Sequence, residues 1–235
     1  MSIYHLHIPR TAGIYVNNNV LPYLISNGIP HFASNRSFID TDKIKKAKYV
    51  GGHFGTMPIE LMENPDVFAV VRDPVERFIS YFKYTTGLIR TKSQAYQKLD
   101  SWLYGDQLEM QSNLQSKFLT GKMDIHKFNP GVTEFQKAVN NGWFIEDYSL
   151  DIQNIKNAVD QYYIYTIDNY NLFKEDLNKA LKANFGFTTF KHKDKANESD
   201  DIGIQFTKSQ IERIKELNYI DMEMYDYVQK IKKRY

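Results

Sequence analysis

Short apolar runs alternate along the chain with longer amphipathic segments. Ile3, Tyr4, Leu6 and Ile8 form a first β-prone run. Residues 67–71, VFAVV, form a second run, and five consecutive apolar residues suit a strand buried on both faces. Runs of this kind separated by helical segments predict an α/β protein with a central, mainly parallel sheet flanked by helices.

Other segments extend this pattern. A helix is expected over 14–27, kinked or ended at Pro22, and residues 29–47 look irregular apart from a basic helical turn. A short strand is expected within 48–54, and a further β-prone run lies at 162–167. The remaining expected helices cover 74–82, 94–103, 107–119, 171–184 and 207–232, and Gly186 is expected to stop the fourth of them.

Two of these helices have clear end signals. Asp73 is an expected N-cap before Pro74, and Pro is well tolerated at the first helical position. Thr207 is the expected N-cap of the last helix. The buried stripe of that helix is expected at Ile211, Ile214, Leu217, Ile220, Met224 and Tyr227 or Val228.

The segment after the first run has the composition of an anion site. It combines small residues, one cation and a helix start, over Pro9, Arg10, Thr11, Ala12, Gly13, Ile14 and Tyr15. Backbone N–H groups and the positive end of a helix favour a phosphate or a sulfate there. An edge strand followed by an ordinary turn gives the same local pattern, so both interpretations stay open. The segment does not fit a Walker A motif, because Arg10 precedes Gly13 and no Lys-Ser/Thr pair follows.

A second segment strengthens the anion-site interpretation. Arg72 follows the buried run 67–71 directly, and a predicted helix with Arg77 and Ser80 comes next. Arg72 is therefore expected at the carboxyl end of a strand, where open α/β sheets bind their ligands. A local ion pair between Glu76 and Arg77 is the plainer role for those two residues.

His53 is the candidate for acid–base chemistry. It follows a predicted strand and two glycines, Gly51 and Gly52, which allow backbone to approach a ligand closely. A histidine titrates near neutral pH and suits a general base, although a lone histidine is more often structural. His5 and His7 lie within the first strand and are weaker candidates.

Composition narrows the class of protein. The 235 residues suit a single domain over 1–235, and the net charge of +2 argues against a nucleic-acid partner. The chain has no cysteine, which excludes disulfides and thiolate metal sites, and no metal is expected. No run approaches the ~18 apolar residues of a membrane span, and no signal peptide is evident. We therefore expect a soluble, cytoplasmic protein.

The two candidate segments, HIPRTAG and RDPVERFISYF, resemble the paired phosphate-binding segments of sulfotransferases that use 3′-phosphoadenosine 5′-phosphosulfate (PAPS). The likeness is strongest to the carbohydrate branch, which includes the heparan and uronyl 2-O-sulfotransferases. Gly52-His53 resembles the segment that carries the catalytic base in that branch. Residues 113–115 with 119–121, 163–181, and 217–221 with Tyr225 are similar to later family segments.

The resemblance implies a fold, a reaction and residue roles. The fold would be a P-loop-like three-layer sandwich, and the reaction a sulfuryl transfer from PAPS to an acceptor hydroxyl on a carbohydrate, with the bisphosphate PAP as product. Backbone N–H groups of residues 11–15 would hold the 5′-phosphosulfate, with Arg10 on the bridging oxygen and His53 as base. Arg72 and Ser80 would bind the 3′-phosphate. Lys193 or Lys195, in a polar segment otherwise typical of a surface loop, would reach it as well.

The first segment departs from the family pattern at two places. Arg10 stands where Lys is usual, and an Arg cannot donate its proton. Ile14-Tyr15 stands where Thr-Ser is usual, so hydroxyl contacts would need Thr11 or the Tyr15 hydroxyl. Two alternatives follow: a PAP- or PAPS-binding protein with degenerate catalysis, and a P-loop-type small-molecule kinase.

Overall fold

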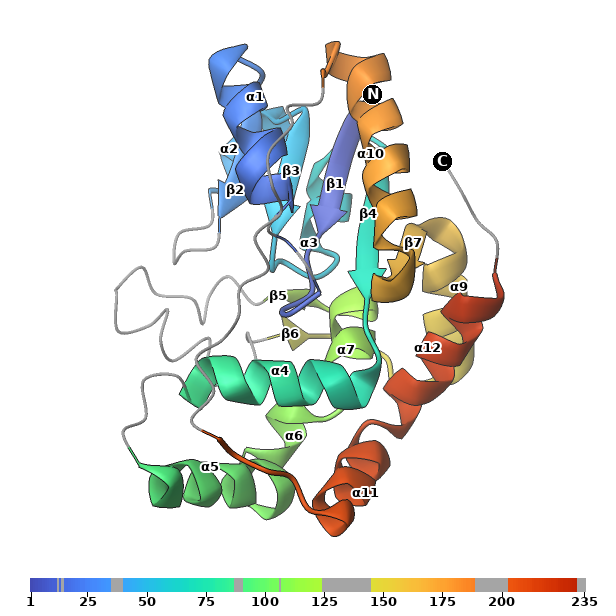
Figure 1. The fold of residues 1–235 in the computed structure, drawn as a ribbon. Coiled ribbons are helices and arrows are strands. Elements are labelled where there is room, and N and C mark those ends of the chain that lie inside the picture. The colour runs from blue at the N-terminus through green and yellow to red at the C-terminus, as the bar shows by residue number, and fades with distance from the viewer. Residues whose placement is uncertain are drawn as a thin grey trace.

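The computed structural model describes residues 1–11, 13, 15–34, 40–86, 91–105, 107–123, 145–188 and 203–231. Its centre is a five-stranded sheet in the order β2-β3-β1-β4-β7, in which every pair is parallel. The strands are β1 (Ser2–Leu6), β2 (His31–Ser34), β3 (Tyr49–Gly52), β4 (Pro65–Val71) and β7 (Tyr163–Thr166). The expected α/β class with a parallel sheet is confirmed (Figure 1).

Helices flank the sheet, and a short antiparallel pair, β5 (Lys122–Met123) with β6 (Ile145–Glu146), lies below the carboxyl ends of the strands in Figure 1. The helices are η1 (Val16–Val20), α1 (Leu21–Ser26), α2 (Thr41–Lys46), α3 (Met57–Leu61), α4 (Pro74–Thr86), α5 (Lys92–Tyr104), α6 (Leu108–Gln111), α7 (Leu114–Thr120), α9 (Ile152–Gln161), η3 (Ile167–Asn169), α10 (Tyr170–Phe185), α11 (Lys208–Leu217) and α12 (Tyr219–Lys230). Helix α4 crosses below the carboxyl ends of the strands in Figure 1.

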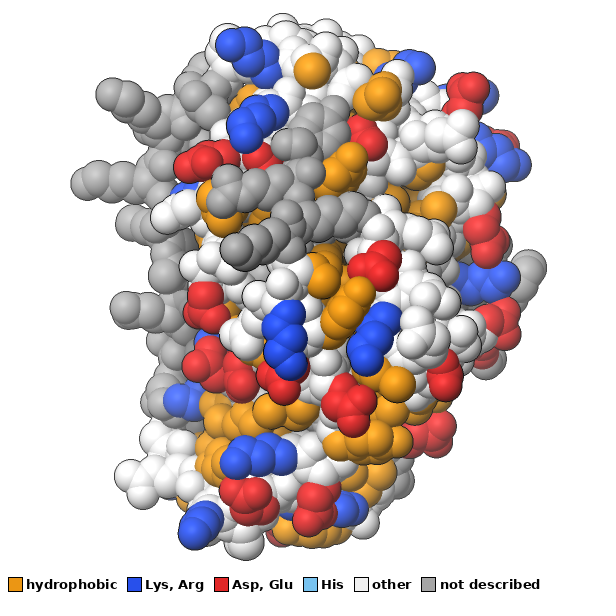
Figure 2. Space-filling view, turned by 90° about the vertical axis from the view of Figure 1, so that its right-hand side faces the viewer, with side chains coloured by type: hydrophobic (Ala, Val, Ile, Leu, Met, Phe, Trp, Pro, Cys, Tyr) orange, Lys and Arg blue, Asp and Glu red, His pale blue; other side chains and the backbone are white. Residues whose placement is uncertain are grey.

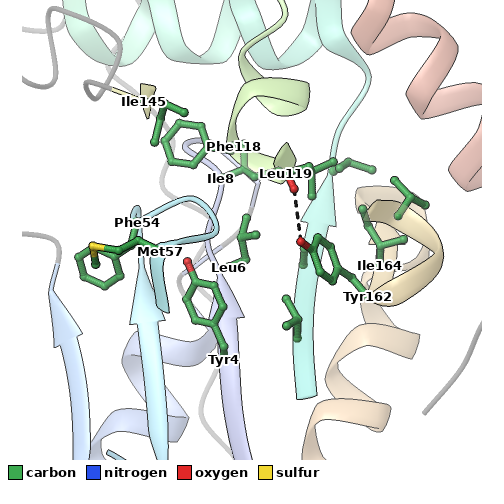
Figure 3. Packing of buried hydrophobic residues seen from close by; sticks show 14 of the residues in the cluster. Tyr4, Leu6, Ile8, Phe54, Met57, Phe118, Leu119, Ile145, Tyr162 and Ile164 are labelled. Carbon is green, nitrogen blue, oxygen red and sulfur yellow. Dashed lines mark hydrogen bonds between the residues drawn. The ribbon is translucent and has the colours of Figure 1, made fainter. Parts of the chain in front are cut away.

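Alternate residues of β1 face two different cores, as expected for a strand covered on both faces. Tyr4 and Leu6 pack with side chains of α3, α7, α9 and α12, whereas Ile3 packs with those of η1, α1 and α10. Figure 3 shows the first of these cores, with the Tyr162 hydroxyl directed at the Leu119 oxygen. The buried apolar runs therefore place the sheet between two hydrophobic cores.

A third core lies away from the sheet and joins α4, α5 and α11. Trp102 is fully buried there, with ring contacts to Phe78, Tyr81 and Phe82. Its indole N–H donates to Gln107 at 2.8 Å. This helical layer supports α4 from the side opposite the sheet.

Several predicted helix ends are confirmed. The Asp73 carboxylate accepts the Glu76 N–H at 2.9 Å, and α4 begins at Pro74. Helix α10 ends at Gly186, which adopts a left-handed conformation with φ 68°. Thr207 caps α11 in a capping box with Gln210.

Three predictions are corrected. The segment 29–47 contains β2, whose four residues pair with β3 and bury Phe32 against Phe54, so tertiary pairing forms a strand that the short sequence run does not indicate. The helix expected over 14–27 begins with the π-helical turn η1, and Pro22 lies in the first turn of α1, where its missing N–H is tolerated.

The single helix expected over 207–232 is two helices, α11 and α12. Asn218 separates them, because its side-chain amide donates to the Ile214 oxygen at 2.8 Å and its oxygen accepts the Asn113 N–H at 3.0 Å. A side chain that bonds locally to backbone in this way competes with helix continuation. The predicted apolar stripe is still buried at Ile214, Leu217, Ile220, Met224 and Val228.

Figure 2 shows that Lys and Arg side chains are interspersed with Asp and Glu side chains over the face that it presents, with hydrophobic patches between them. No helix within the described residues is both long and apolar enough to cross a membrane.

Candidate functional site

Three loops that carry the candidate residues leave neighbouring strands at the same edge of the sheet. His53 follows β3, Pro9 and Arg10 follow β1, and Arg72 follows β4. These strands are adjacent and parallel, in the order β3-β1-β4, so their carboxyl ends lie together. The two segments singled out in the sequence therefore meet in space.

The loop after β1 begins with a strained turn. The Thr11 N–H donates to the Ile8 oxygen at 3.3 Å across Pro9 and Arg10, and Arg10 has φ 70°. A proline followed by a positive φ is the pattern of a type II turn, in which glycine is favoured at the position that Arg10 occupies. The Thr11 hydroxyl also donates to the Ile8 oxygen, at 2.8 Å, and Thr11 is only 1 % exposed. The Thr11 hydroxyl therefore stabilises the turn.

Arg10 reaches across to α4. Its Nε donates to the Ser80 Oγ at 3.1 Å, and its guanidinium carbon lies 4.9 Å from the centre of the Tyr84 ring. Partial burial lowers the pKa of Arg10, and the nearby positive charge of Arg72 lowers it further. The structure therefore brings Arg10, Ser80 and Arg72 together.

Two interactions fix Arg72, one on its backbone and one on its side chain. The Gln115 amide holds the Arg72 peptide from both sides: its oxygen accepts the Arg72 N–H at 2.9 Å, and its nitrogen donates to the Arg72 oxygen at 2.8 Å. The Arg72 Nε donates to Glu76 at 3.2 Å on the solvent side. The expected pairing of Glu76 with Arg77 is thus replaced by one with Arg72.

His53 has a defined tautomer. Its Nδ1 lies 2.6 Å from the His7 main-chain oxygen, and a carbonyl can only accept, so Nδ1 carries the proton and Nε2 carries the lone pair. His53 is 9 % exposed, and burial lowers its pKa to about 4 although the bond to His7 opposes this shift. His53 is therefore neutral at pH 7, in the form that can accept a proton.

Hydrogen bonds to Gly55 and from Thr56 hold the loop that carries His53. The Tyr4 hydroxyl donates to the Gly55 oxygen at 2.6 Å, and the Thr56 N–H donates to the Gly121 oxygen at 2.8 Å. A Cβ on Gly55 would lie 2.2 Å from the Gly121 oxygen, so only glycine allows this approach of the two segments. These contacts hold the position of His53 relative to the sheet.

Three imidazole rings stack at this edge. The ring centroid of His7 lies 5.3 Å from that of His5 and 4.4 Å from that of His53. Burial lowers the pKa of His5 to about 3 and also lowers that of His7, which the neighbouring charges of His53, His5 and Arg10 depress further. The His7 ring covers Gly13, where a Cβ would lie 2.1 Å from the ring carbon Cε1.

A buried hydrogen-bond network ties the start of α7 to the α11–α12 junction. The Asn113 N–H donates to the Asn218 side-chain oxygen, and the Asn113 side-chain oxygen accepts the Ile220 and Asp221 N–H groups. The Asp221 carboxylate accepts the Gln115 N–H at 3.0 Å and both the N–H and the hydroxyl of Ser116. Through Gln115, this network reaches the Arg72 peptide.

Arg77 lies in the interior beside this network. It is fully buried, and none of its three side-chain nitrogens has a hydrogen-bond partner within the described residues. Burial lowers its pKa, and the negative charge of Asp221 opposes that shift. The expected local ion pair of Arg77 with Glu76 does not fit this position, and Asp221 supplies the opposite charge.

Some predicted site residues have other positions or fall outside the structure. The Tyr15 hydroxyl donates to the Asn178 oxygen at 2.7 Å, away from the turn. Ala12, Ile14, Lys193 and Lys195 lie outside the described residues. Within those residues, no group of three His, Asp or Glu side chains is placed to hold a metal ion.

Sequence reasoning missed the roles of three residues that shape the site. His7 holds His53 through a main-chain oxygen, which no side-chain pattern reveals. Gln115 and Asp221 lie in segments that were noted only for their likeness to a family. Gln115 binds Arg72, which is 43 positions away in the sequence, and Asp221 binds Gln115, which is 106 positions away.

Comparison with known proteins adds no assignment: no protein-family model matches the chain, and no curated protein matches it either.

Proposed function

We propose that this protein is a PAPS-dependent sulfotransferase that transfers a sulfuryl group to an acceptor hydroxyl. One observation carries the proposal: a neutral histidine with a fixed tautomer, His53, lies at the same sheet edge as two cations, Arg10 and Arg72, and the Ser80 hydroxyl. Sulfuryl transfer needs a base for the acceptor and cations for the donor's phosphates. Both kinds of group are present on adjacent strands.

In the proposed reaction, the acceptor oxygen attacks the sulfur in line with the bond to the bridging oxygen. The new S–O bond forms as the bridging S–O bond breaks, and the electron pair of that bond leaves with the 5′-phosphate of PAP. The acceptor proton moves to the His53 Nε2. Arg72 and Ser80 would hold the 3′-phosphate, because a planar guanidinium and a hydroxyl both donate to phosphate oxygens.

The acceptor class rests on the sequence resemblance to carbohydrate sulfotransferases. Sugar hydroxyls are weak nucleophiles with high pKa values, and a base within reach of the hydroxyl proton makes the oxygen a better nucleophile. A carbohydrate hydroxyl is therefore the acceptor that we propose to screen first.

A second candidate is a PAP- or PAPS-binding protein with little transfer activity, and one observation favours it. The two hydroxyls that could replace the family's Thr-Ser contacts are already engaged, Thr11 with the Ile8 oxygen and Tyr15 with Asn178. The donor would then rely on backbone N–H groups and cations alone.

Calorimetric titration with PAP, AMP and ATP, first without metal and then with Mg²⁺, tests the cofactor class. The proposal predicts a preference for PAP of at least tenfold that does not depend on Mg²⁺. Preference for ATP with Mg²⁺ would favour the kinase alternative, and no binding of any nucleotide would remove both.

Transfer of labelled sulfate from PAPS to a panel of saccharides separates the two remaining candidates. A sulfotransferase should label an acceptor, and His53→Gln should abolish labelling while PAP binding stays within about threefold of wild type. PAP binding without transfer to any acceptor would favour the binding protein. Full activity of His53→Gln would remove His53 as the base.

A further inference from the structure

We propose that Arg10 binds the 3′-phosphate together with Ser80 and Arg72, and that it does not act on the bridging oxygen of the transferred group. The inference rests on the proposed function and names a specificity-determining residue within it. The ligand group concerned is a phosphomonoester, whose dianion suits several convergent donors.

Within the described residues, the contacts of the Arg10 side chain are with α4. Its Nε is 3.1 Å from the Ser80 Oγ, which is the hydroxyl assigned to the 3′-phosphate. Ser80 and Tyr84 lie four residues apart on α4 and therefore share one face of the helix. Arg10 contacts both, so its guanidinium lies along that face.

In this position the Nη groups of the guanidinium can donate hydrogen bonds to a ligand. Nε is the nitrogen that forms a hydrogen bond, and within the described residues the two Nη groups have no acceptor. An Arg can bind a phosphate through two parallel N–H groups. A phosphate beside Ser80 would accept from the Nη groups without disturbing the Nε contact.

Electrostatics favour a dianion between the two arginines. Arg10 and Arg72 are close enough for the charge of Arg72 to lower the pKa of Arg10. Glu76 pairs with Arg72 on the solvent side, where its own side chain is 60 % exposed. A bound phosphate dianion would neutralise both cations and remove their repulsion.

The backbone of Arg10 gives an independent argument. Its φ of 70° places a non-glycine residue in the left-handed region, at a turn position where glycine would avoid strain. This conformation carries the side chain across to α4. Backbone strain of this kind is found at ligand-binding sites, where the strained residue positions a side chain for binding.

Nucleotide titrations on matched variants test the inference. Arg10→Gln should weaken PAP binding at least tenfold and AMP binding less than twofold, because AMP lacks the 3′-phosphate. Ser80→Ala should show the same selectivity in smaller measure. In the double variant the loss should be smaller than the product of the single losses, since both residues would serve one phosphate.

Lys45→Gln is the control, because it removes an exposed positive charge on α2, where Lys45 pairs with Asp42; it should leave both affinities within twofold. Equal weakening of PAP and AMP by Arg10→Gln would overturn the inference and return Arg10 to the 5′ side. A wild-type protein that does not distinguish PAP from AMP would instead overturn the proposed function, and the inference with it.

Discussion

The Nδ1 atom of His53 lies 2.6 Å from the main-chain oxygen of His7, and this one hydrogen bond decides what His53 can do. The proton stays on Nδ1, so Nε2 is the basic atom. The partner is a backbone group of the neighbouring strand's exit loop. Substitution of the His7 side chain therefore leaves the acceptor in place, and the tautomer of His53 depends on backbone geometry.

The low pKa of His53 predicts an unusual pH profile. A base must be neutral to act, and burial lowers this pKa to about 4, so kcat/KM for transfer should stay level from pH 8 down to about 5. The decline should begin only as the pH approaches 4. Steady-state rates across this range, with circular dichroism at each pH to establish that the protein is folded, give the measurement. An inflection near pH 6.5 would contradict the assignment.

Buried neutral histidines also predict acid sensitivity of the fold. His5 and His53 have folded-state pKa values of about 3 and about 4, below the value of about 6.5 for an unfolded histidine. Between these limits the unfolded chain binds more protons, so stability is full above pH 6.5 and falls as the pH drops. Each residue should contribute a loss of about 1.4 kcal/mol per pH unit.

Urea denaturation at pH 7, 6 and 5 measures this loss. His5→Phe keeps an aromatic ring against Phe173 and removes one titrating group, so its stability should fall less steeply with acidity than that of wild type. Identical slopes for the two proteins would show that His5 is not held neutral.

The contact between Gly13 and His7 predicts a sharp steric effect. A Cβ on Gly13 would lie 2.1 Å from Cε1 and 2.4 Å from Nε2 of the His7 ring, which is stacked between two other rings. Gly13→Ala should therefore destabilise the protein by about 1–3 kcal/mol in urea denaturation. In a His7→Ala background the same change should cost much less, because the ring is gone; an equal cost would point to backbone strain at Gly13.

Asp221 should be among the costliest polar residues to remove. Asp221→Ala deletes an acceptor of three hydrogen bonds and leaves the Gln115 and Ser116 N–H groups buried without a partner. The expected loss of stability is about 2–4 kcal/mol, with Asp221→Asn between this variant and wild type. Asp226→Ala, an exposed carboxylate on the same helix, should change stability by less than about 0.5 kcal/mol. Similar effects at the two positions would mean that the network contributes little.

The parts of the fold that depend on local signals were predictable from the sequence. The buried run of β4, the Asp73–Pro74 helix start and the Gly186 stop need only their own neighbours, and the structure confirms them. The strand β2 and the break at Asn218 depend on partners far along the chain. A four-residue strand gains its stability from pairing with β3, which a sequence window does not contain.

The site divides in the same way. His53, Arg10 and Arg72 lie at one edge because each follows one of three adjacent parallel strands. The sequence placed each residue after a strand, but it did not predict the order of those strands. The direction of the Arg10 side chain was beyond the sequence, because it depends on a positive φ at a non-glycine residue. The contact of Gln115 with the Arg72 peptide could not be predicted either. The two residues are far apart in the sequence, and no sequence pattern indicates such a contact.

The hydrogen bond from the Asn113 N–H to the Asn218 side chain has a consequence for the order of folding. Its two partners are 105 residues apart, and closing so long a loop is an entropic cost that local contacts do not offset. The first turn of α7 gains its acceptors only after the α11–α12 junction has docked, whereas neighbouring strands such as β1 and β4 can pair without it. The amide that holds the Arg72 peptide is thus locked in place late. A refolding chain should regain its parallel sheet before it regains the contact between Gln115 and the Arg72 peptide.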